Sequence, residues 1–388
     1  MRIFKRIISA FLLVLTVGIA GVVVINTCSY IFGFNNSLTT LMSGAMNALD
    51  NAASGIVNAV YDIGEAAESL HSGGGPSGIS KNPAIPVAPV TETPDSNAEN
   101  TKQSSVSKPV AAEDLKSVWG KTGMDGLTVY EYGKSLLNNE ERSAYCQIVD
   151  AVHNIKDSVT ITSTLSPTNM KKVYQYFLYD HVEVFYIKGI NLRYIERNTK
   201  TEYTFDFEYR YDKKNIPGMR KKYRTMALKI LSAADGLSTD YKKEKAIHDK
   251  LIKWCSYDIK AAEDPTIYAH PDSFSAYGAF VNRKAVCVGY AQAMKLLLSS
   301  VGIKSLYVTG TANGGGHAWN EVQIGGKWYF VDATFDDPVY VDSNGNYLDR
   351  NTVSYTYFNF KSKKDHVLGK FNSSDPFAAD SENYEVMP

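Results

Sequence analysis

Residues 317–332 read HAWNEVQIGGKWYFVD, two strand-like runs joined by Gly325-Gly326. A Gly-Gly pair between such runs is typical of a β-hairpin with a two-residue turn. Counting outward from this turn places Trp319 opposite Asp332. His317 and Asp332 then become diagonal neighbours on one face, about 7–8 Å apart at the backbone, which an imidazole–carboxylate hydrogen bond can span. The opposite face of the hairpin carries a predicted core, which consists of Val322, Ile324, Tyr329, Val331 and Ala333.

A cysteine opens the most apolar helix pattern in the second half of the chain. Residues 287–298 read CVGYAQAMKLLL, and Gly302 ends the pattern. Such a run predicts a buried helix with Cys287 at or near its N-terminal end. There the unpaired backbone amides and the positive end of the helix dipole favour thiolate over thiol.

Cys287, His317 and Asp332 together supply a nucleophile, a base and an orienting carboxylate. We therefore predict that these three residues are catalytic. Cys287 would attack an acyl carbon and form a thioester, while its own backbone amide helps to hold the oxyanion. The competing interpretation is a buried structural cysteine and an unrelated surface histidine; the hairpin geometry and the flanking motifs disfavour it.

Further motifs surround these residues: Ile247–Leu251, Tyr257-Asp258, Ala276–Phe280, Val286–Ala291, Gly316–Asn320 and Trp328–Pro338. In residue type, order and spacing they resemble the transglutaminase-like superfamily, in its bacterial exported and membrane-anchored branch. The specific resemblance covers roughly residues 240–340, and a weaker likeness reaches back to about Tyr130. Val288 stands where Gln is frequent in the family, and Phe335 where Trp is frequent.

The resemblance implies an α+β fold with a papain-like core, in which the cysteine-bearing helix packs on an antiparallel sheet. It also implies a thiol enzyme that forms a Cys thioester from an amide, either a peptide bond or a Gln side chain. The acyl group would pass to water or to an amine, and the resemblance leaves both acceptors open. A protein or peptide substrate is expected, a cell-wall peptide among the candidates. No cofactor is expected, and no metal site, because no His, Cys or Asp cluster in the sequence has metal-ligand spacing.

Other residues near the motifs have open roles. Tyr277 or Asn320 could complete the oxyanion hole or position the triad. The aromatic residues Trp319, Trp328 and Tyr290 could line a substrate channel, and ordinary core packing is an equal alternative for the tryptophans. A second function also remains open, a non-catalytic module of the same fold that binds cell-surface protein or peptide.

The N-terminal residues 1–36 indicate where the protein lies relative to the cell membrane. Arg2, Lys5 and Arg6 precede the apolar run Ile7–Ile25, which is long enough to come close to spanning a bilayer core. We favour an uncleaved single-pass membrane anchor over a cleaved signal segment. Basic residues before the run predict that everything after it is extracellular. The alternative is a secreted protein released by cleavage.

Residues 37–71 carry a heptad pattern between Leu38 and Leu70, with small and larger apolar residues alternating every three and four positions. This pattern predicts a helix that could form a self-associating stalk, or a single amphipathic helix. Residues 72–113 are rich in Pro, Ser and Gly, and residues 72–113 contain no aromatic residue. That composition predicts a disordered linker.

Globular sequence begins at residue 114. Residues 114–238 predict a mixed α and β portion, and residues 239–388 the transglutaminase-like catalytic domain. The helices are expected at Leu136–Ile155, Met170–Tyr179, Gly218–Ala234 and Thr239–Cys255. Ser166-Pro167 should begin the second of these as cap and first-turn proline. The strands are expected at Val182–Ile187, Ile190–Glu196, Tyr203–Tyr211 and Ile303–Thr309, with a loop at Gly310–Gly316. Aromatic and polar residues alternate along Tyr203–Tyr211, and we expect the aromatic face to pack under a helix.

Composition excludes several classes of protein. The 388 residues contain 41 Lys and Arg against 41 Asp and Glu, so no excess of positive charge supports binding to nucleic acid. Four cysteines are too few for a disulfide-rich scaffold. Whether Cys146 and Cys255 pair with each other cannot be read from the sequence.

Overall fold

A computed structural model describes residues 90–94, 115–264, 269–313, 315–341, 347–348, 352–360 and 365–368. The predicted membrane segment 1–36 and heptad segment 37–71 lie outside these residues, as does most of the predicted linker. Within the described ranges, no helix is long and apolar enough to cross a membrane. The predictions for the N-terminal segments therefore stay predictions.

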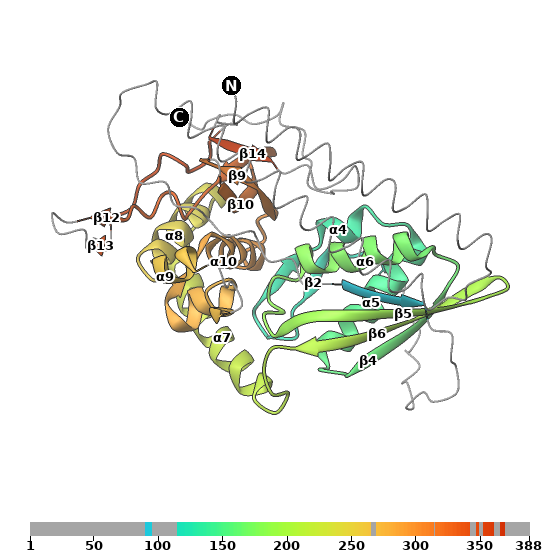
Figure 1. Ribbon diagram of the computed structural model, residues 1–388. Helices are drawn as coiled ribbons and strands as arrows, with labels where there is room; N and C mark the ends of the chain where they lie inside the picture. The colour runs from blue at the N-terminus through green and yellow to red at the C-terminus, as the bar shows by residue number, and fades with distance from the viewer. Residues whose placement is uncertain are drawn as a thin grey trace, which may run out of the picture. The chain divides into compact units, whose positions relative to one another are not determined.

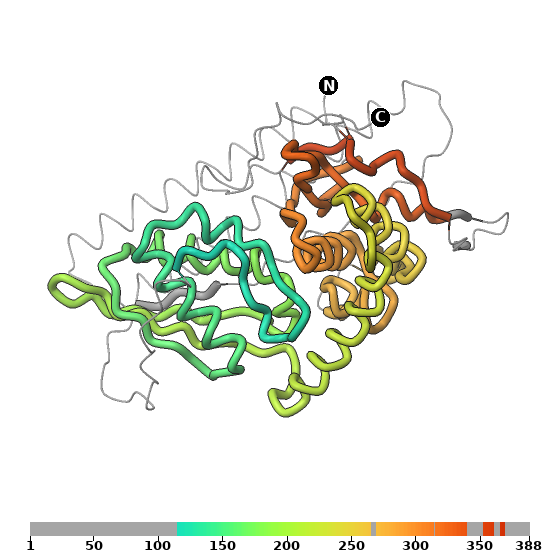
Figure 2. Tube along the Cα trace, turned by 180° about the vertical axis from the view of Figure 1, so that it is seen from behind, coloured from blue at the N-terminus to red at the C-terminus, as the bar shows by residue number. Residues whose placement is uncertain are grey.

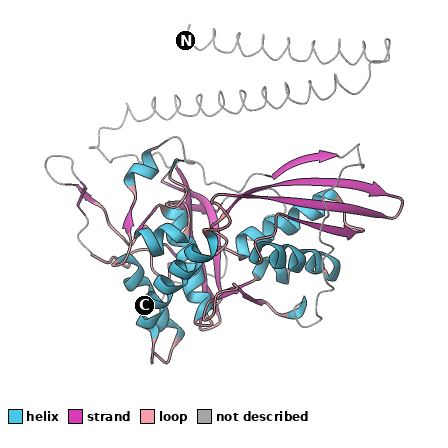
Figure 3. Ribbon diagram, turned by 90° about the horizontal axis from the view of Figure 1, so that it is seen from below, coloured by secondary structure: helices cyan, strands magenta, loops and turns pink. Residues whose placement is uncertain are grey.

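The first sheet has the strand order β1-β5-β6-β4. Its centre is the antiparallel pair β5 and β6, with β4 antiparallel to β6 and β1 parallel to β5. Figure 3 shows these strands as one layer and the helices α5 and α6 as a second layer beside it. The bounds are β1 Val90–Pro94, β4 Ser158–Ser163, β5 Ile187–Arg197, β6 Lys200–Tyr209, α4 Tyr132–Ser135, α5 Asn139–His153 and α6 Pro167–Asp180.

Aromatic side chains of β6 form the core beneath these helices. Tyr203, Phe205 and Phe207 are buried, and the Phe205 ring lies 6.1 Å from the ring of Tyr174 on α6. The expectation that this aromatic face packs under a helix is confirmed. Burial of rings on one face of the strand is what holds the two layers together.

Local capping sets where the two helices begin. The Asn138 side chain accepts hydrogen bonds from the amides of Glu140 and Glu141, and the Glu141 carboxylate accepts the Asn138 amide in return. This capping box starts α5 at Asn139, three residues later than predicted. Ser166 caps α6 and Pro167 is its first residue, as the sequence predicts.

Two predictions fail in this half of the chain. Residues 182–186 form successive turns rather than a strand, closed by the amide of Val184 on the His181 carbonyl and that of Ile187 on the Val184 carbonyl. Residues 181–187 are all buried, so apolar content there reflects burial and not strand pairing. The linker prediction is wrong for residues 90–94, because β1 pairs with β5 and gains its backbone hydrogen bonds from that edge.

A series of helices and short strands leads to the second half of the chain. Short parallel strands β7 and β8 bring residues 256–257 beside residues 284–285. The hairpin of β2 and β3 joins the N-terminal half to α10, because Lys295 on α10 donates to the Tyr130 carbonyl at 2.8 Å. The bounds are β2 Trp119–Lys121, β3 Thr128–Tyr130, α7 Ile216–Leu231, η1 Ser232–Ala234, α8 Asp240–Ile252, β7 Ser256–Tyr257, α9 Ile259–Glu263, η3 Gly278–Asn282, β8 Lys284–Ala285 and α10 Cys287–Ser300.

The second sheet has the antiparallel order β11-β10-β9-β14. In Figures 1 and 2 its strands lie against the buried helix α10, with α8 on another side of that helix. Mixed α and β structure with antiparallel sheets agrees with the expected fold class. The bounds are β9 Ser305–Ala312, β10 Gly315–Ile324, β11 Lys327–Val331, β12 Tyr340–Val341, β13 Tyr347–Leu348 and β14 His366–Leu368.

The predicted hairpin register is confirmed. Ile324 pairs with Lys327 and Asn320 with Val331, while Gly325 and Gly326 have φ values of 58° and 82°. Positive φ at both turn residues is the reason for glycine there. The loop predicted at residues 310–316 is largely wrong, because β9 and β10 continue their ladder to the pair Ala312 and Gly315. Small residues pair in a ladder as well as large ones do.

Candidate active site

Cys287 is the first residue of α10, and its side chain is buried. Val286 before it is extended, and its amide donates to the Ser273 carbonyl at 2.9 Å. Gly289, two residues after Cys287, lies so close to the Ser273 and Ser275 carbonyls that a Cβ there would meet them at 3.0 and 2.8 Å. The loop of residues 273–275 therefore holds the start of the helix in place.

His317 on β10 and Asp332, one residue beyond β11, form a direct hydrogen bond. The distance between His317 Nε2 and Asp332 Oδ2 is 2.6 Å, and both side chains are buried. The hairpin register brings the two together, as the diagonal relationship predicts. A proton on Nε2 leaves Nδ1 as the imidazole nitrogen that can exchange a proton with another group.

Cys287 is close enough to His317 to change the pKa of its imidazole. Burial lowers the pKa of His317, but the Asp332 carboxylate and the Cys287 sulfur outweigh it and raise the pKa to about 10. Nδ1 is buried and makes no hydrogen bond of normal geometry with the described residues. The sulfur is thus close enough to influence the imidazole, although Nδ1 makes no hydrogen bond of normal geometry to it.

Asp332 is held as an anion by four donors. Oδ2 accepts from the ring nitrogens of two histidines, and Oδ1 accepts from the amides of Thr334 and Phe335 at 2.9 and 3.1 Å. Burial favours the neutral acid, yet His317 and then His366 hold the pKa of Asp332 well below its usual range. A carboxylate in this state fixes the orientation of His317 and stabilises its protonated form.

The second histidine on Asp332 is His366, which the sequence analysis missed. Its Nε2 lies 2.9 Å from Asp332 Oδ2, and its ring lies 5.1 Å from Trp319 and 5.0 Å from Phe335. His366 is on β14, which pairs with β9 and so belongs to the same sheet as His317. No motif marks this position, and only the sheet brings it to the site.

Comparison with known proteins finds a match to the same part of the chain. Residues 229–333 match the model of the transglutaminase-like superfamily. By this match we call residues 229–333 the transglutaminase-like domain. The domain contains Cys287, His317 and Asp332, whereas His366 lies beyond the matched residues.

Similar proteins include peptidases and transglutaminases by name. The kyphoscoliosis peptidase of Homo sapiens is 28% identical over 109 residues, which are 25% of this chain and 16% of that protein. A solved transglutaminase structure is 19% identical over 46% of this chain and 52% of its own, with a TM-score of 0.27. The periplasmic domain of TgpA from Pseudomonas aeruginosa is 17% identical over 36% of this chain and 57% of its own, with a TM-score of 0.22. TM-scores this low carry no argument about function, and the chain spans only a small part of the curated relative.

Tyr277 and Asn320 of the transglutaminase-like domain are engaged elsewhere. The Tyr277 ring packs 4.6 Å from the Phe185 ring, and both amide hydrogens of Asn320 are donated, to the carbonyls of Ala291 and Leu306 at 2.9 and 3.0 Å. Donation from Asn320 to an oxyanion would break those bonds. Its contacts suit the other predicted role, because they tie α10 to β9 and thereby position the cysteine helix.

The predicted channel residues pack in the core or against it. Tyr290 is fully buried, and its hydroxyl lies 2.8 Å from the Cys255 carbonyl and 2.5 Å from the Asp337 carboxylate, so it is a core residue and not a channel lining. Trp319 is buried, and its ring stacks on that of His317 at 5.8 Å. Trp328 on β11 is partly buried and packs against the same core.

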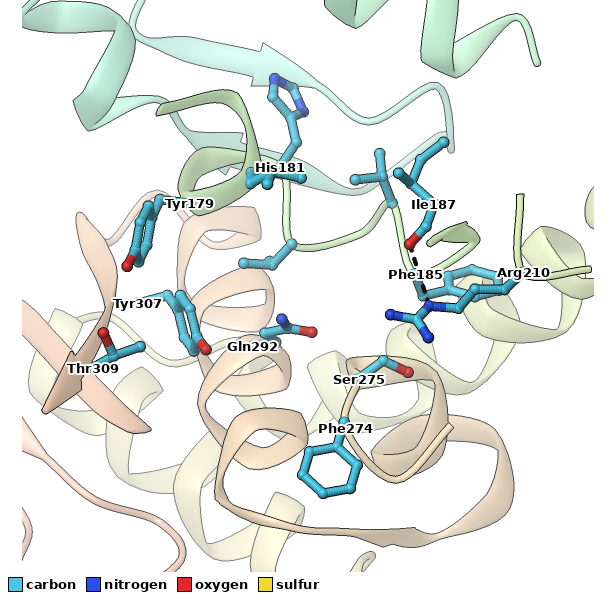
Figure 4. Close-up of a pocket in the computed structure, with 13 residues that line it drawn as sticks. Tyr179, His181, Phe185, Ile187, Arg210, Phe274, Ser275, Gln292, Tyr307 and Thr309 are labelled. Carbon is cyan, nitrogen blue, oxygen red and sulfur yellow. Dashed lines mark hydrogen bonds between the residues drawn. The ribbon is translucent and has the colours of Figure 1, made fainter. Parts of the chain in front are cut away.

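Two hollows lie beside the site. An inner cavity of about 90 Å³ separates residues 178–187 from α10 and β9, and Figure 4 shows Gln292 and Tyr307 on one side of it. A larger cleft of about 500 Å³, here named the Tyr257 cleft, is large enough to hold a ligand. It is lined by Ser256, Tyr257, Asp258, Ile259, Lys260, Glu263, Lys284, Asp337, Pro338 and Val339.

Tyr257 connects this cleft to the triad. Burial, followed by the nearness of Cys287 and Asp332, raises the pKa of Tyr257, so its hydroxyl stays protonated. The sequence contained Tyr257 within a family motif but gave no reason to place it near Cys287. The parallel pairing of β7 with β8 supplies that reason, because β8 ends two residues before Cys287.

Ligand atoms of His317, Asp332 and His366 lie within 4.8 Å of one another, as a metal site would require. Both Nε2 atoms already bind the same Asp332 oxygen, and aromatic rings enclose the imidazoles. The four donors on Asp332 satisfy this carboxylate without a metal ion. The group is therefore best described as an extended hydrogen-bond network.

Proposed function

We propose that the transglutaminase-like domain is a thiol enzyme that takes an acyl group from an amide through a Cys287 thioester. The observation that carries the proposal is the position of the His317 imidazole. Its Nε2 is hydrogen-bonded to Asp332 at 2.6 Å, and Cys287 is near enough to raise its pKa. This is the arrangement in which a base removes a thiol proton while a carboxylate stabilises the imidazolium.

Each step balances within these groups. The thiol proton passes to Nδ1 of His317, which the raised pKa of the imidazole favours, and the resulting thiolate attacks the amide carbon to form a tetrahedral oxyanion. Collapse breaks the carbon–nitrogen bond, and the leaving amine takes the proton from Nδ1. Water or a second amine then attacks the thioester, with Nδ1 accepting its proton and returning it to the sulfur. Hydrolysis and transamidation differ only in this last nucleophile.

Two donors support the oxyanion in this proposal. The amide of Cys287 is in the first turn of α10, where backbone amides have no partner within the helix. The second donor is the Tyr257 hydroxyl. Cys287 is near enough to raise the pKa of Tyr257, so this hydroxyl keeps its proton and can donate it. Preorganised donors of this kind contribute more than any other single factor in many acyl-transfer enzymes.

The substrate class in this proposal is a protein or peptide, held in the Tyr257 cleft. Its volume of about 500 Å³ is that of a few residues of extended chain, and both Lys260 and Glu263 line it. The peptidase named among the similar proteins supports the same substrate class. We further propose that the domain works outside the cell membrane, which the basic residues before the apolar run of residues 7–25 support.

Selective alkylation of the full-length chain tests the proposal. Iodoacetamide should label Cys287 faster than Cys255, which is also buried, and His317→Gln should remove the difference. Mass spectrometry of tryptic peptides measures the rates. A peptide library carrying amide or ester reporters should then give a Cys287 acyl-enzyme with the wild-type chain and none with Cys287→Ala.

Equal labelling of Cys287 and Cys255, with no acyl-enzyme from any reporter, would contradict the proposal. The fold would then be that of the non-catalytic binding module. Peptide binding that survives in Cys287→Ala without turnover in the wild type would identify this second function.

A further inference from the structure

A second group of buried ligand-type side chains lies in the N-terminal half, far along the sequence from the triad. His153 is the last residue of α5, His181 follows the end of α6, and Glu183 lies in the turns after it. His181 and Glu183 are 0% and 1% exposed, and the His153 side chain is 12% exposed. Their ligand atoms all lie within 4.8 Å of one another.

The three side chains converge on one point. Glu183 Oε1 lies 3.0 Å from His153 Nε2 and 2.7 Å from His181 Nδ1, and the two imidazole rings meet edge to face at 5.3 Å. Two imidazole nitrogens and one carboxylate oxygen are the donor set of open zinc sites, in which a water completes the tetrahedron. In Figure 4 the His181 ring points away from the inner cavity, so the group lies behind the cavity wall.

A buried oxygen without a partner is the second observation. Glu183 Oε2 accepts no hydrogen bond from any described residue, although its carboxylate is almost fully buried. Leaving a charged oxygen unsatisfied in a protein interior is costly, and a bound cation removes that cost. A further carboxylate of α6 is already satisfied: Asp180 accepts from the amides of Gly133 and Lys134 and from the Tyr145 hydroxyl.

The remaining nitrogen of His181 has the partner that a metal ligand needs. Its Nε2 lies 3.1 Å from Glu131 Oε1, while the other oxygen of Glu131 binds Lys134 at 2.8 Å. A carboxylate on the far nitrogen orients a ligating histidine and raises its basicity. The group thus has ligands, a satisfied second layer of contacts, and one unsatisfied oxygen.

From these contacts we propose that His153, His181 and Glu183 form a site for a divalent transition metal ion, of which Zn²⁺ fits the donors best. The role is structural. Val182, Val184 and Phe185 are sequence neighbours of the ligands His181 and Glu183, and they line the inner cavity together with Gln292 and Tyr307. A bound ion would hold this wall of turns, which has no strand pairing of its own, against α5 and α6.

Metal counting in the full-length chain tests the site. A Cys287→Ser background removes the thiolate as a competing ligand. After treatment with a chelator, this chain should bind one Zn²⁺ in isothermal titration calorimetry, and Zn²⁺ should raise its melting temperature. Glu183→Gln and His153→Gln should each weaken binding more than about 100-fold, and Glu131→Gln by about 10–100-fold through loss of His181 orientation.

Two controls separate this site from other causes. Glu244→Gln changes another fully buried Glu that also has an oxygen without a partner, and it should leave Zn²⁺ affinity unchanged. His366→Gln removes an imidazole from the histidine group at Asp332 and should likewise leave Zn²⁺ affinity unchanged. The ligand variants should keep the circular dichroism spectrum of the metal-free parent.

If a ligand variant fails to fold, the visible spectrum of Co²⁺ bound to the parent chain tests the site instead. A Co²⁺ complex of this site should show visible d–d bands without a thiolate charge-transfer band. Three results would each overturn the proposal. They are no Zn²⁺ binding by the parent chain, a Zn²⁺ affinity in Glu183→Gln and His153→Gln equal to that of the parent, and loss of Zn²⁺ binding in His366→Gln. In those cases the proton on His181 between Glu131 and Glu183 is the cation that the cluster holds.

Discussion

His366 and His317 share one oxygen of Asp332, at 2.9 and 2.6 Å. The residues are 49 positions apart in the sequence, and they meet because β14 and β10 flank β9 in one sheet. The catalytic carboxylate of our proposal is therefore oriented by a residue outside the matched family segment. Removing His366 should therefore disturb the triad through Asp332, without removing a contact to the substrate.

His366→Phe should reduce turnover and weaken folding. The ring would still pack among Trp319, Phe335 and Phe360, but Asp332 would lose a hydrogen bond to a charged group, which is worth about 1.5–3 kcal/mol. Urea unfolding and the kcat of the acyl-enzyme reaction measure the two effects. His366→Gln supplies an amide donor, so it should recover part of both; full activity in His366→Phe would show that Asp332 needs no second imidazole.

The triad variants should differ in residual activity. Cys287→Ala should reach background, and His317→Ala should come close to it, because nucleophile and base act as a unit. Each carboxylate oxygen of Asp332 now accepts two N–H groups. Asp332→Asn replaces one of these oxygens with an NH₂ group, which cannot accept a hydrogen bond, so two of the four donors lose their acceptor. We expect a loss of about 10⁴ in kcat, the size seen in a serine-protease triad, and also a loss of stability. Turnover by Cys287→Ala on any substrate of the wild type would rule the mechanism out.

Tyr257→Phe isolates the oxyanion donor. It should lower kcat by about 10²–10³, because one donor to the tetrahedral intermediate is lost, and leave alkylation of Cys287 close to the wild-type rate. The Trp328→Phe variant on β11 is the matched aromatic control and should change kcat little. Equal kcat in Tyr257→Phe and the wild type would remove Tyr257 from the mechanism.

The His317–Asp332 pair should give stability a defined pH dependence. The pKa of His317 is raised to about 10, so its contribution is complete below about 6.5 and declines as pH rises towards 10. The pKa of Asp332 is lowered, so its contribution holds above about 4 and declines as pH falls below that. The wild type minus His317→Gln difference in unfolding free energy should fall by at most about 1.4 kcal/mol per pH unit between pH 6.5 and 10. Urea titrations measure it, and a constant difference over that range would contradict the pairing.

Gly289→Ala should disturb the start of the cysteine helix. The added Cβ would meet the Ser275 carbonyl at 2.8 Å and the Ala285 Cβ at 2.7 Å, so the helix or the loop of residues 273–275 must shift. We expect a loss of about 1–3 kcal/mol in stability and slower Cys287 alkylation. Gly218→Ala in α7 meets nothing within 4 Å and should be neutral or stabilising by up to about 1 kcal/mol. Similar effects at both positions would show that the close approach at Gly289 is unimportant.

Local rules predicted much of this fold. Caps placed α6, the Gly325-Gly326 turn fixed the register of β10 and β11, and strand alternation identified the face of β6 that packs under a helix. These features depend on neighbours within a few residues, which is why the sequence contained them.

Contacts between distant residues escaped prediction. β1 exists because the edge of β5 accepts it, and the turns of residues 182–186 form where burial is complete on all sides. His366, and the group of His153, His181 and Glu183, carry no local pattern at all. Each is assembled by the packing of separate elements, so a sequence without an alignment offers no signal for it.

The match to the transglutaminase-like superfamily stops at residue 333, one residue after Asp332, yet the chain continues to brace that residue. The Asp332 amide donates to the Tyr357 carbonyl at 2.9 Å, Phe330 and Phe360 form a bridge, and His366 holds the carboxylate. A gene fusion that transplanted only residues 229–333 would carry all three triad side chains but leave their carboxylate unsupported. The unit that recombination can move intact is consequently longer than the unit that sequence similarity detects, and it reaches at least to β14.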